Sequence, residues 1–355
     1  MGAELTRRSV NDILFPSFGG EIMSKMKIAV VGATGMVGRM FLRVLEERSV
    51  EADYTLFASK RSAGETLLFF GKDHTVCELT EESFKDQNFR FALFSAGGSI
   101  SEHFAPLAAK EGTTVIDNSS FWRMNPDVPL VVPEVNPDAL RSVPLNIIAN
   151  PNCSTIQAVV PLKALDDAYG IERIVYSTYQ AVSGAGQMGY LDLEEGLCGA
   201  LPKKFPHPIA NNCIPHIDVF LPNGNTKEEQ KMIDETRKIL CRPELRVTAT
   251  CVRVPVYHGH SESINVELKK PFDVNGIRQL FERTTGVVVR DDPEHNIYPM
   301  PIEAAGTDPV YVGRIRRDES VENGLNFWCV ADNIRKGAAT NAVQILEELL
   351  RRGDQ

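Results

Sequence analysis

A glycine-rich turn between an apolar strand and an amphipathic helix constrains this chain more than any other feature. The segment MKIAVVGATGMVGRMFLRVLEER, residues 26–48, begins with an apolar run, and Gly32, Gly35 and Gly38 follow it. Apolar residues then recur at helical spacing. Glycines let a backbone approach a pyrophosphate closely, and a helix N-terminus offers free N–H groups and a positive dipole end. The segment therefore predicts a dinucleotide-binding unit, although its GxxGxxG spacing differs from the usual GxGxxG.

The end of the next expected strand indicates which dinucleotide fits. That strand, DYTLFAS at 53–59, runs into Ser59, Lys60, Arg61 and Ser62. An NAD enzyme usually has Asp or Glu there, bonded to the ribose 2′-hydroxyl. Two cations and two hydroxyls suit a 2′-phosphate instead, so the segment favours NADP, with a solvated surface loop as the alternative.

The order of the expected elements predicts two domains, as does a length of 355 residues. We expect an α/β protein with a Rossmann-like dinucleotide-binding domain over 26–152, completed by a C-terminal helix over 333–355. After residue 153 the segments alternate apolar and polar residues, as half-exposed antiparallel strands do. A second, α+β domain with a largely antiparallel sheet is therefore expected over 153–332. Residues 1–25 fit neither pattern and are interpreted as a disordered leader.

Composition narrows the class of protein. A formal net charge of -9 argues against a nucleic-acid partner. The seven cysteines are scattered and never form a CxxC pair, which argues against a disulfide framework and a structural metal site and favours a reducing cytoplasm. No run approaches the ~18 apolar residues of a membrane span.

Cys153 is the first candidate for chemistry. It follows the turn Asn150-Pro151-Asn152 and begins a helix-like run. A cysteine in the first helical turn has a lowered pKa, and its thiolate is a nucleophile. Local evidence alone favours a buried packing role over this one. Pro161 predicts that the helix is short or kinked.

Two basic residues are candidates to assist a thiol. His is its most frequent acid/base partner, and His260 falls at or after a turn, where a side chain can face a cleft. His258 is the competing choice, and a surface imidazole is the alternative for either. Arg253 suits a carboxylate by a two-pronged hydrogen bond, with a structural salt bridge as the alternative.

Three further segments are ambiguous by themselves. The small residues of QAVSGAG, 180–186, leave room for a cofactor ring or a thioester, or form an ordinary loop. Glu228 and Lys231 share a helix face and taken alone predict a solvated ion pair. Arg123 follows a Trp in a loop and taken alone is a surface cation.

Six motifs together carry a resemblance to a known family. They are GATGMVG at 32–38, NPNCSTIQ at 150–157, QAVSGAG at 180–186, EEQK at 228–231, RVPVYHGHS at 253–261 and DNIRKGAA at 332–339. In this order they resemble the aspartate-semialdehyde dehydrogenases over residues 26–352.

The resemblance implies a role for each matched residue. Cys153 is the expected nucleophile, His260 the acid/base catalyst, and Gln180 the residue that orients the acyl group. Arg253 and Glu228 are expected to bind the α-carboxylate and α-amine of the substrate. The residues expected to bind phosphate are Arg123, Lys231 and Asn152. The residues expected to bind the cofactor are Gly32, Thr34, Gly35, Met36, Val37, Ser59, Arg61, Ser62, Ser95, Ala96, Gly97, Ser183, Gly184 and Asn333.

The implied activity is reversible, NADP-dependent reduction of L-aspartyl-4-phosphate to L-aspartate 4-semialdehyde through a cysteine thioester, without a metal. It serves the biosynthesis of lysine (through diaminopimelate), methionine, threonine and isoleucine. The family is typically dimeric through the second domain, sometimes tetrameric. An N-acetyl-glutamyl-phosphate reductase, which shares the Cys–His chemistry, and a non-catalytic NADP-binding protein are the alternatives.

Overall fold

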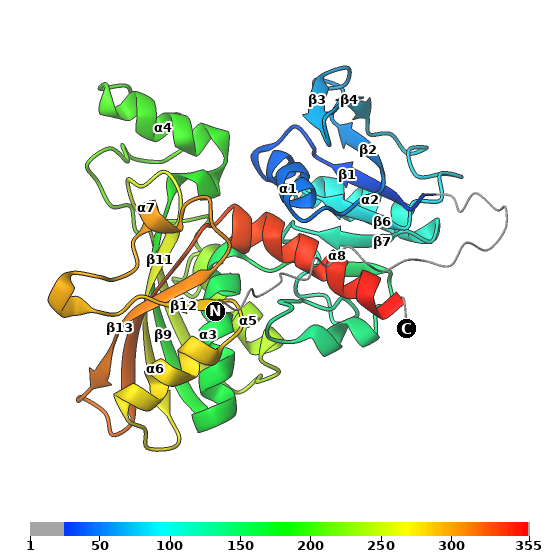
Figure 1. Cartoon of the computed structure of the whole chain (residues 1–355). Coiled ribbons are helices and arrows are strands. Elements are labelled where there is room, and N and C mark those ends of the chain that lie inside the picture. Colours follow the sequence, from blue (N-terminus) through cyan, green and yellow to red (C-terminus); the bar gives the residue numbers. More distant parts are fainter. Residues whose placement is uncertain (1–24, 354–355) are drawn as a thin grey trace, which may run out of the picture.

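The glycine-rich segment joins the first strand to the first helix of a parallel sheet. In the computed structural model, which describes residues 25–353, β1 (Lys27–Val31) leads through the turn into α1 (Met36–Glu47) (Figure 1). Gly32 has a φ of +84°, and a Cβ on Gly38 would lie 2.0 Å from the Gly32 carbonyl oxygen. Only glycine permits this turn and this close approach.

A six-stranded sheet forms the first lobe, in the order β5-β2-β1-β6-β7-β8, with all neighbouring strands parallel. Its other strands are β2 (Asp53–Ala58), β5 (Cys77–Glu78), β6 (Phe91–Phe94), β7 (Thr114–Asp117) and β8 (Ile147–Ala149). Helix α2 (Gly98–Lys110) follows β6, and β3 (Thr66–Phe69) pairs with β4 (Lys72–Thr75) as a small hairpin. The expected doubly wound, Rossmann-like domain is confirmed.

A second six-stranded sheet forms the other lobe, in the order β10-β9-β11-β14-β13-β12. Pairs β9–β11, β11–β14 and β13–β14 are antiparallel and the two outer pairs are parallel, so the expected largely antiparallel sheet is confirmed. The strands are β9 (Ile171–Gln180), β10 (Arg246–Arg253), β11 (His260–Leu268), β12 (Val287–Val289), β13 (Val310–Asp318) and β14 (Gly324–Ala331).

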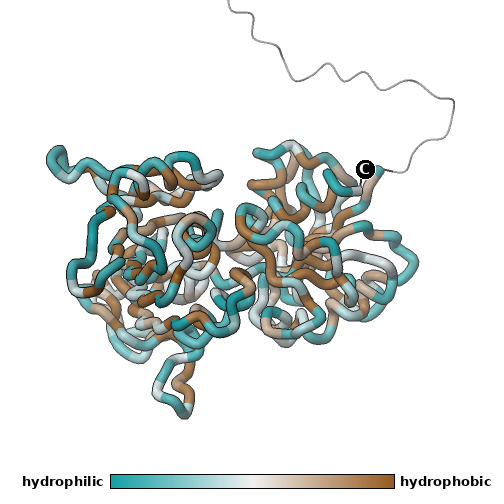
Figure 2. Tube along the Cα trace, turned by 90° about the horizontal axis from the view of Figure 1, so that it is seen from below, coloured by the Kyte–Doolittle hydropathy of each residue, from teal (hydrophilic) through white to brown (hydrophobic). Residues whose placement is uncertain are grey.

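Three helices cover one face of this second sheet. They are α3 (Cys153–Tyr169), α5 (Lys227–Ile239) and α6 (Val274–Arg283), and α3 contacts the other two as well as β9, β11 and β14. Helix α4 (Gln187–Leu197) projects from the lobe at the upper left of Figure 1, and the short α7 (Pro301–Ala304) lies beside β14. Figure 2 shows the two lobes side by side, with hydrophobic segments in the interior of each.

The C-terminal helix returns to the first lobe. A π-helical turn, Arg335–Ala339, leads into α8 (Thr340–Gly353), which is red in Figure 1. Its buried residues Ala342, Val343, Ile345 and Leu346 share a core cluster with β1 and α1. The chain therefore crosses between the lobes twice, once at Cys153 and once at this turn.

The prediction that Pro161 shortens the helix is wrong. Helix α3 runs through Pro161 for 17 residues. A proline cannot donate to the carbonyl four residues earlier, here that of Gln157. The Cys329 thiol donates to that carbonyl oxygen instead, at 3.6 Å. Because Pro161 itself is buried, tertiary packing also supports the helix there.

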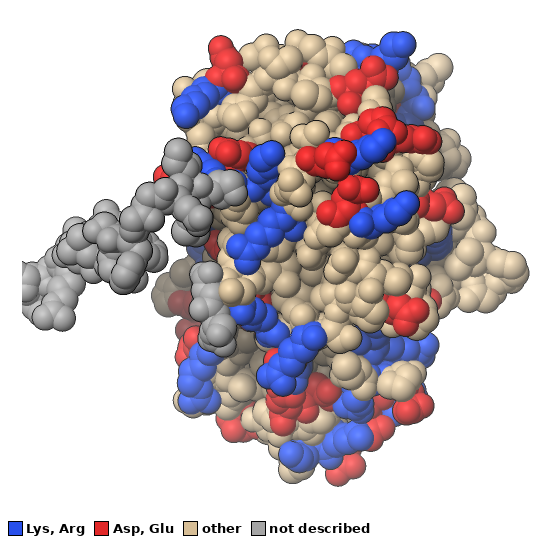
Figure 3. Space-filling view, turned by 90° about the vertical axis from the view of Figure 1, so that its right-hand side faces the viewer, with Lys and Arg blue, Asp and Glu red and all other residues tan. Residues whose placement is uncertain are grey.

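Residues 1–24, and with them nearly all of the predicted leader, lie outside the described residues, as do residues 354–355. Within the described chain, no helix combines the length and apolarity needed to cross a membrane. No group of three or more potential metal-binding side chains occurs in that same part. All seven cysteines are unpaired thiols. Cationic and anionic side chains are interspersed on the face of the first lobe shown in Figure 3.

Candidate active site

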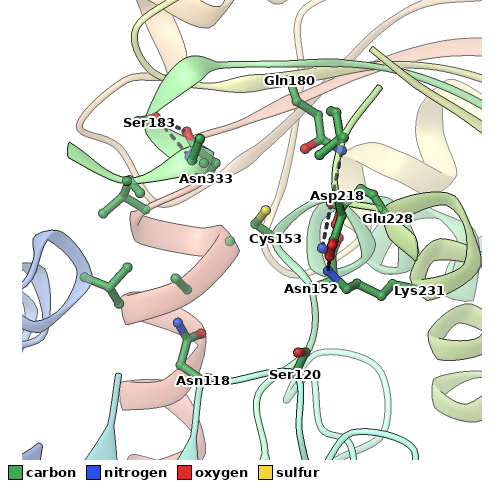
Figure 4. Close-up of a pocket in the computed structure, with 18 of the residues that line it drawn as sticks. Asn118, Ser120, Asn152, Cys153, Gln180, Ser183, Asp218, Glu228, Lys231 and Asn333 are labelled. Carbon is green, nitrogen blue, oxygen red and sulfur yellow. Dashed lines mark hydrogen bonds and ion pairs between the residues drawn. The ribbon is translucent and has the colours of Figure 1, made fainter. Parts of the chain in front are cut away.

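A cavity of about 550 Å³ is lined by residues from both lobes. The start of α1, the start of α3, the end of β9 and the turn before α8 all contribute to its wall. Figure 4 shows the Cys153 sulfur between Ser183 and Asn333 on one side and Gln180 and Glu228 on the other. The cavity therefore brings together residues that are far apart in the sequence.

Cys153 is the first residue of α3, and Asn152 caps that helix. The Asn152 side-chain oxygen accepts hydrogen bonds from the backbone N–H groups of Ser154 at 3.0 Å and Thr155 at 3.2 Å. The thiol is half-buried and lines the cavity. A Cβ added to Gly337 would lie 2.9 Å from the Cys153 Cβ, so the turn before α8 packs directly on the cysteine. Its location at a helix start is as predicted.

The predicted lowering of the Cys153 pKa is wrong for the ligand-free protein. Burial raises the pKa of the Cys153 thiol to about 12, and the negative charge of Glu228 raises it further. Arg253, Arg123 and Lys231 act in the opposite direction without outweighing burial. The thiol is therefore the resting form, and bound substrate has to change its surroundings before it reacts.

Arg253, Gln180 and His260 lie side by side at the ends of three strands; Arg253 and Gln180 line the cavity, and His260 lies behind Gly184. Arg253 and Gln180 are paired in register at the ends of β10 and β9, and His260 begins β11. The Arg253 Nη1 donates to the Ala181 carbonyl at 2.7 Å. All three side chains are almost fully buried. The sheet, not a flexible loop, therefore fixes their relative positions.

The hydrogen bonds of His260 define its state. The Ala181 N–H donates to His260 Nδ1 at 3.0 Å, so in the neutral ring the proton is on Nε2. Burial lowers the His260 pKa well below its ordinary value, and the charge of Arg253 adds to this. A Cβ on Gly184 would lie 3.2 Å from Nε2 and 2.9 Å from Arg253 Nη1. His258 instead lies beside the Tyr190 ring, whereas His260 packs against Gly184 and near Arg253, so the structure favours His260 over His258.

Glu228 links the start of α3 to the end of β9. Its Oε1 accepts hydrogen bonds from Asn152 Nδ2 at 2.8 Å and Gln180 Nε2 at 3.2 Å (Figure 4). Its Oε2 accepts from Lys231 Nζ at 3.1 Å. Lys231 opposes the effect of burial most strongly and holds the Glu228 pKa below its ordinary value. Glu228 is thus an ionised, buried carboxylate and not part of a solvated pair.

Arg123 is buried, whereas its sequence position taken alone predicted a surface cation. Its Nε donates to the Asn150 carbonyl at 3.0 Å, its Nη2 to the Asn118 carbonyl at 3.0 Å, and its Nη1 to Glu235 Oε1 at 3.1 Å. These contacts hold the guanidinium rigidly at the cavity wall beside the start of α3.

The residues expected to bind the cofactor fall into three groups. A second cavity, of about 460 Å³, is lined by Gly32, Thr34, Gly35, Ser59, Ser95 and Ala96. The first cavity is lined by Met36, Val37, Ser183, Gly184 and Asn333. The two cavities adjoin at the N-terminus of α1, an arrangement that suits a dinucleotide with its pyrophosphate at the helix start. Arg61, Ser62 and Gly97 line neither cavity; Arg61 is exposed and Ser62 is buried.

Several cavity residues were not predicted. Asp218 in the cavity wall accepts a hydrogen bond from Lys231 Nζ at 2.9 Å, and Glu235, buried behind the wall, accepts from the Asn152 N–H at 2.6 Å. Glu235 lies one helical turn beyond Lys231, a spacing visible in the sequence. Others come from loops that carried no signal of their own. The remaining unpredicted polar residues at the cavity are Asn118, Ser120 and Lys204.

Comparison with known proteins agrees with this architecture. Residues 27–143 match the family described as semialdehyde dehydrogenase, NAD binding domain, and residues 162–336 match semialdehyde dehydrogenase, dimerisation domain. The aspartate-semialdehyde dehydrogenase of Aquifex aeolicus is 56% identical over 92% of this chain and 98% of its own length. This chain belongs to the aspartate-semialdehyde dehydrogenase family.

Solved structures of family members have the same fold. Aspartate semialdehyde dehydrogenase II from Vibrio cholerae, complexed with ASA, has a TM-score of 0.89 and 48% identity, and the match covers 92% of this chain and 99% of that one. The enzyme from Candida albicans, solved with NADP, has a TM-score of 0.73 and 27% identity over 92% of this chain and 98% of that one.

Proposed function

We propose that this protein is an NADP-dependent aspartate-semialdehyde dehydrogenase that interconverts L-aspartyl-4-phosphate and L-aspartate 4-semialdehyde. The observation that carries the proposal is the placement of Cys153, a helix-start cysteine, in a cavity lined by Gln180 and Arg253, with His260 packed behind the cavity residue Gly184. Family membership selects the substrate over the acetylated glutamyl phosphate. A complete set of reactive groups argues against a non-catalytic binding protein.

The substrate would be held at both of its ends. The Arg253 guanidinium, with its buried Nε lacking a partner among the described residues, offers donors to the α-carboxylate. The ionised Glu228 offers a counter-charge to the α-ammonium group. Arg123 and Lys231 supply positive charge for the phosphate group, beside Asn152 at the start of α3. Charges that are fixed before the reaction stabilise a developing anion without reorganisation.

The thiol chemistry proceeds in two stages. Cys153 Sγ bonds to the acyl carbon as the carbon–oxygen bond to phosphate breaks, the thiol proton leaves with the departing phosphate, and a thioester is left on Cys153. NADPH, when bound, supplies the hydride that reduces this thioester carbon. The carbon–sulfur bond then breaks, the aldehyde leaves, and Cys153 is reprotonated. His260 Nε2–H is the donor that would stabilise the substrate oxygen and exchange the proton.

Residues 59–62 support NADP over NAD. Ser59 and Lys60 line the second cavity, and Arg61 is exposed next to them. The glycine-rich turn packs closely on the end of β6, since a Cβ on Gly32 would lie 2.3 Å from the Ser95 carbonyl oxygen. This close packing supports a dinucleotide site at the ends of these strands. Two cations at the end of β2 provide a counter-charge for a 2′-phosphate.

The proposed quaternary structure is a homodimer through the uncovered face of the second sheet. Tyr179 and Trp328 lie on this face, opposite α3, with ring centroids 5.5 Å apart. Other partly exposed apolar residues of the lobe are Val288, Ile297 and Met300. Sedimentation equilibrium separates this dimer from the alternative tetramer. The free thiols agree with the proposed cytoplasmic location.

The central experiment measures phosphate-dependent reduction of NADP by aspartate semialdehyde. Cys153→Ala should lower kcat at least about 10³-fold, because it removes the only group that forms the thioester. Cys241→Ala, which changes a surface cysteine, is the matched control and should retain wild-type kcat. Retained turnover in Cys153→Ala would refute the covalent mechanism.

A second experiment tests the cofactor. Wild-type kcat/KM should be higher with NADP than with NAD, and Arg61→Ala should lower it for NADP by about tenfold, the loss of one charged contact, while leaving NAD unaffected. Arg43→Ala, an exposed cation on α1, serves as the control. A wild-type preference for NAD would contradict the NADP assignment.

A further inference from the structure

A second polar row lies beneath the catalytic row of the sheet. The next residues along these strands that face the same side of the sheet form this row. Four of them pair across neighbouring strands and are fully buried. They are Cys251 on β10, Thr178 on β9, Glu262 on β11 and Cys329 on β14. The next row is made of core residues, including Tyr176 and Ile264. Polar groups thus occupy the layer between the catalytic residues and the core, where apolar side chains are usual.

Glu262 occupies this layer as a buried carboxyl group without a cationic partner among the described residues. Both of its carboxyl oxygens are buried without a partner among the described residues. The groups that face it are Gln157 on α3, Glu228 on α5, and the hydroxyl or thiol groups of Tyr176, Cys251 and Cys329. None of these is a cation. Burial raises the Glu262 pKa well above its ordinary value; contact with the Gln157 side chain opposes this effect, and the charge of Glu228 adds to it.

Gln157 connects this layer to His260. Its Nε2 donates to the His260 backbone carbonyl at 3.2 Å. The opposite amide orientation would place two acceptors against each other, so the nitrogen must face His260. The Gln157 Oε1 is then a buried acceptor, and it has no donor within the described chain. The adjacent side chain that carries a proton to offer is Glu262.

We propose that Glu262 is a positioning residue whose carboxyl O–H donates to Gln157 Oε1 and thereby fixes the amide that holds the His260 backbone. The proposal rests on the proposed function of His260. The Ala181 N–H fixes the His260 imidazole at Nδ1, and the Gln157 side chain fixes the His260 backbone carbonyl. Together these two contacts set the direction of Nε2–H. A catalytic group held in this way loses rate when the supporting contact is removed, even though the group itself is intact.

Two substitutions of Glu262 distinguish a role as a hydrogen-bond donor from a role as a negative charge. Glu262→Gln keeps an N–H donor of similar shape and should leave kcat within about threefold of wild type. Glu262→Met removes the donor at similar volume and should lower kcat about 10- to 100-fold, with KM for aspartate semialdehyde changed little. If Glu262 acts as a carboxylate, Glu262→Gln loses activity as severely as Glu262→Met, which overturns the proposal.

A double-mutant cycle tests whether the effect passes through Gln157. In a Gln157→Leu background, Glu262→Met should lower kcat no further, whereas independent contributions would multiply. Multiplying effects, or wild-type kcat in Glu262→Met, overturn the proposal. If Glu262→Met does not fold, the comparison of Glu262→Gln with wild type still decides between donor and carboxylate.

A structural measurement keeps this proposal separate from the proposed function. The ¹⁵N resonances of His260, identified by their loss in His260→Asn, should match wild type in Glu262→Gln and shift in Glu262→Met. If the wild-type protein does not oxidise aspartate semialdehyde, the proposed function is refuted and the positioning role of Glu262 is not. Unchanged His260 resonances in folded Glu262→Met refute the positioning role alone.

Discussion

The resting state of Cys153 is set by opposing charges around a partly buried thiol. Burial and Glu228 raise its pKa, while Arg253, Arg123 and Lys231 lower it. A substrate ammonium group that pairs with Glu228 would cancel one of the two raising influences. Activation of the nucleophile would then depend on the correct substrate being bound, which protects a reactive cysteine in the free enzyme.

Alkylation of the free enzyme by iodoacetamide tests this balance. With a thiol pKa of about 12, the rate at Cys153 should rise about tenfold per pH unit between pH 7 and 10, because only the thiolate reacts. Glu228→Gln should accelerate alkylation at every pH in this range, and Lys231→Met should slow it. Asp234→Asn, on the same helix but absent from the Cys153 surroundings, is the control. A rate that levels off near pH 7 would contradict the raised pKa.

The grouping of the candidate site residues was predictable where several motifs agreed. Cys153 alone favoured a packing role, and only its combination with Gln180, Arg253 and His260 pointed to chemistry. Its pKa was not predictable, because the helix start is visible in the sequence whereas burial and the approach of Glu228 depend on packing. Glu262 did have a signal: it takes an inward position in the alternation of HSESINVEL, shared with His260 and apolar residues.

At the scale of elements, periodicity predicted α1 and the C-terminal helix, whereas α4 was not predicted and α3 continues past Pro161. At Pro161 the Gln157 carbonyl lacks its helical donor and accepts from the Cys329 thiol, which is 172 residues away in the sequence. A local rule cannot anticipate a partner supplied by a distant strand. By contrast, the Thr226 cap of α5 is local: its Oγ1 accepts from the Glu229 N–H at 3.3 Å, and Glu229 Oε2 accepts from the Thr226 N–H at 2.6 Å.

The α5 cap should stabilise the fold without controlling turnover. Thr226→Val removes the capping oxygen at constant shape and should lower the free energy of unfolding by about 1 kcal/mol. The kcat should change little, because Asn152 and Gln180 still hold Glu228. Thr226→Ser, which retains the oxygen, is the control. Urea unfolding and steady-state kinetics measure the two quantities, and a large fall in kcat without loss of stability would show that the cap positions Glu228.

At the scale of the whole molecule, the site depends on how the chain returns to the first lobe. The turn that places Gly337 against Cys153 also contains Lys336, which is fully buried. Lys336 Nζ lies 2.8 and 2.7 Å from the two carboxylate oxygens of Glu134 in the first lobe, and Gln344 Nε2 donates to the same carboxylate at 2.9 Å. One buried ion pair therefore anchors both α8 and the wall of the active site.

Replacing one member of this ion pair should lower the free energy of unfolding more than replacing both members. Lys336→Met leaves the Glu134 carboxylate buried without its cation and should lower the free energy of unfolding by about 3–5 kcal/mol. The double variant Lys336→Met/Glu134→Gln should recover much of this loss, because no uncompensated charge remains. Urea unfolding of the wild type, the two single variants and the double variant measures the coupling energy of the pair. The exposed pair Lys85–Glu82 is the control and should show little coupling energy.

The same pair predicts an acid dependence of stability. Lys336 opposes burial most strongly and holds the Glu134 pKa below its ordinary value. A carboxyl group with a lowered pKa in the folded state contributes stability above its unfolded pKa, and that contribution disappears as the pH falls through the folded pKa. The free energy of unfolding of the wild type should therefore fall more steeply on acidification than that of the double variant. Parallel pH profiles for the two proteins would mean that Glu134 and Lys336 do not act as an ion pair across the return of the chain.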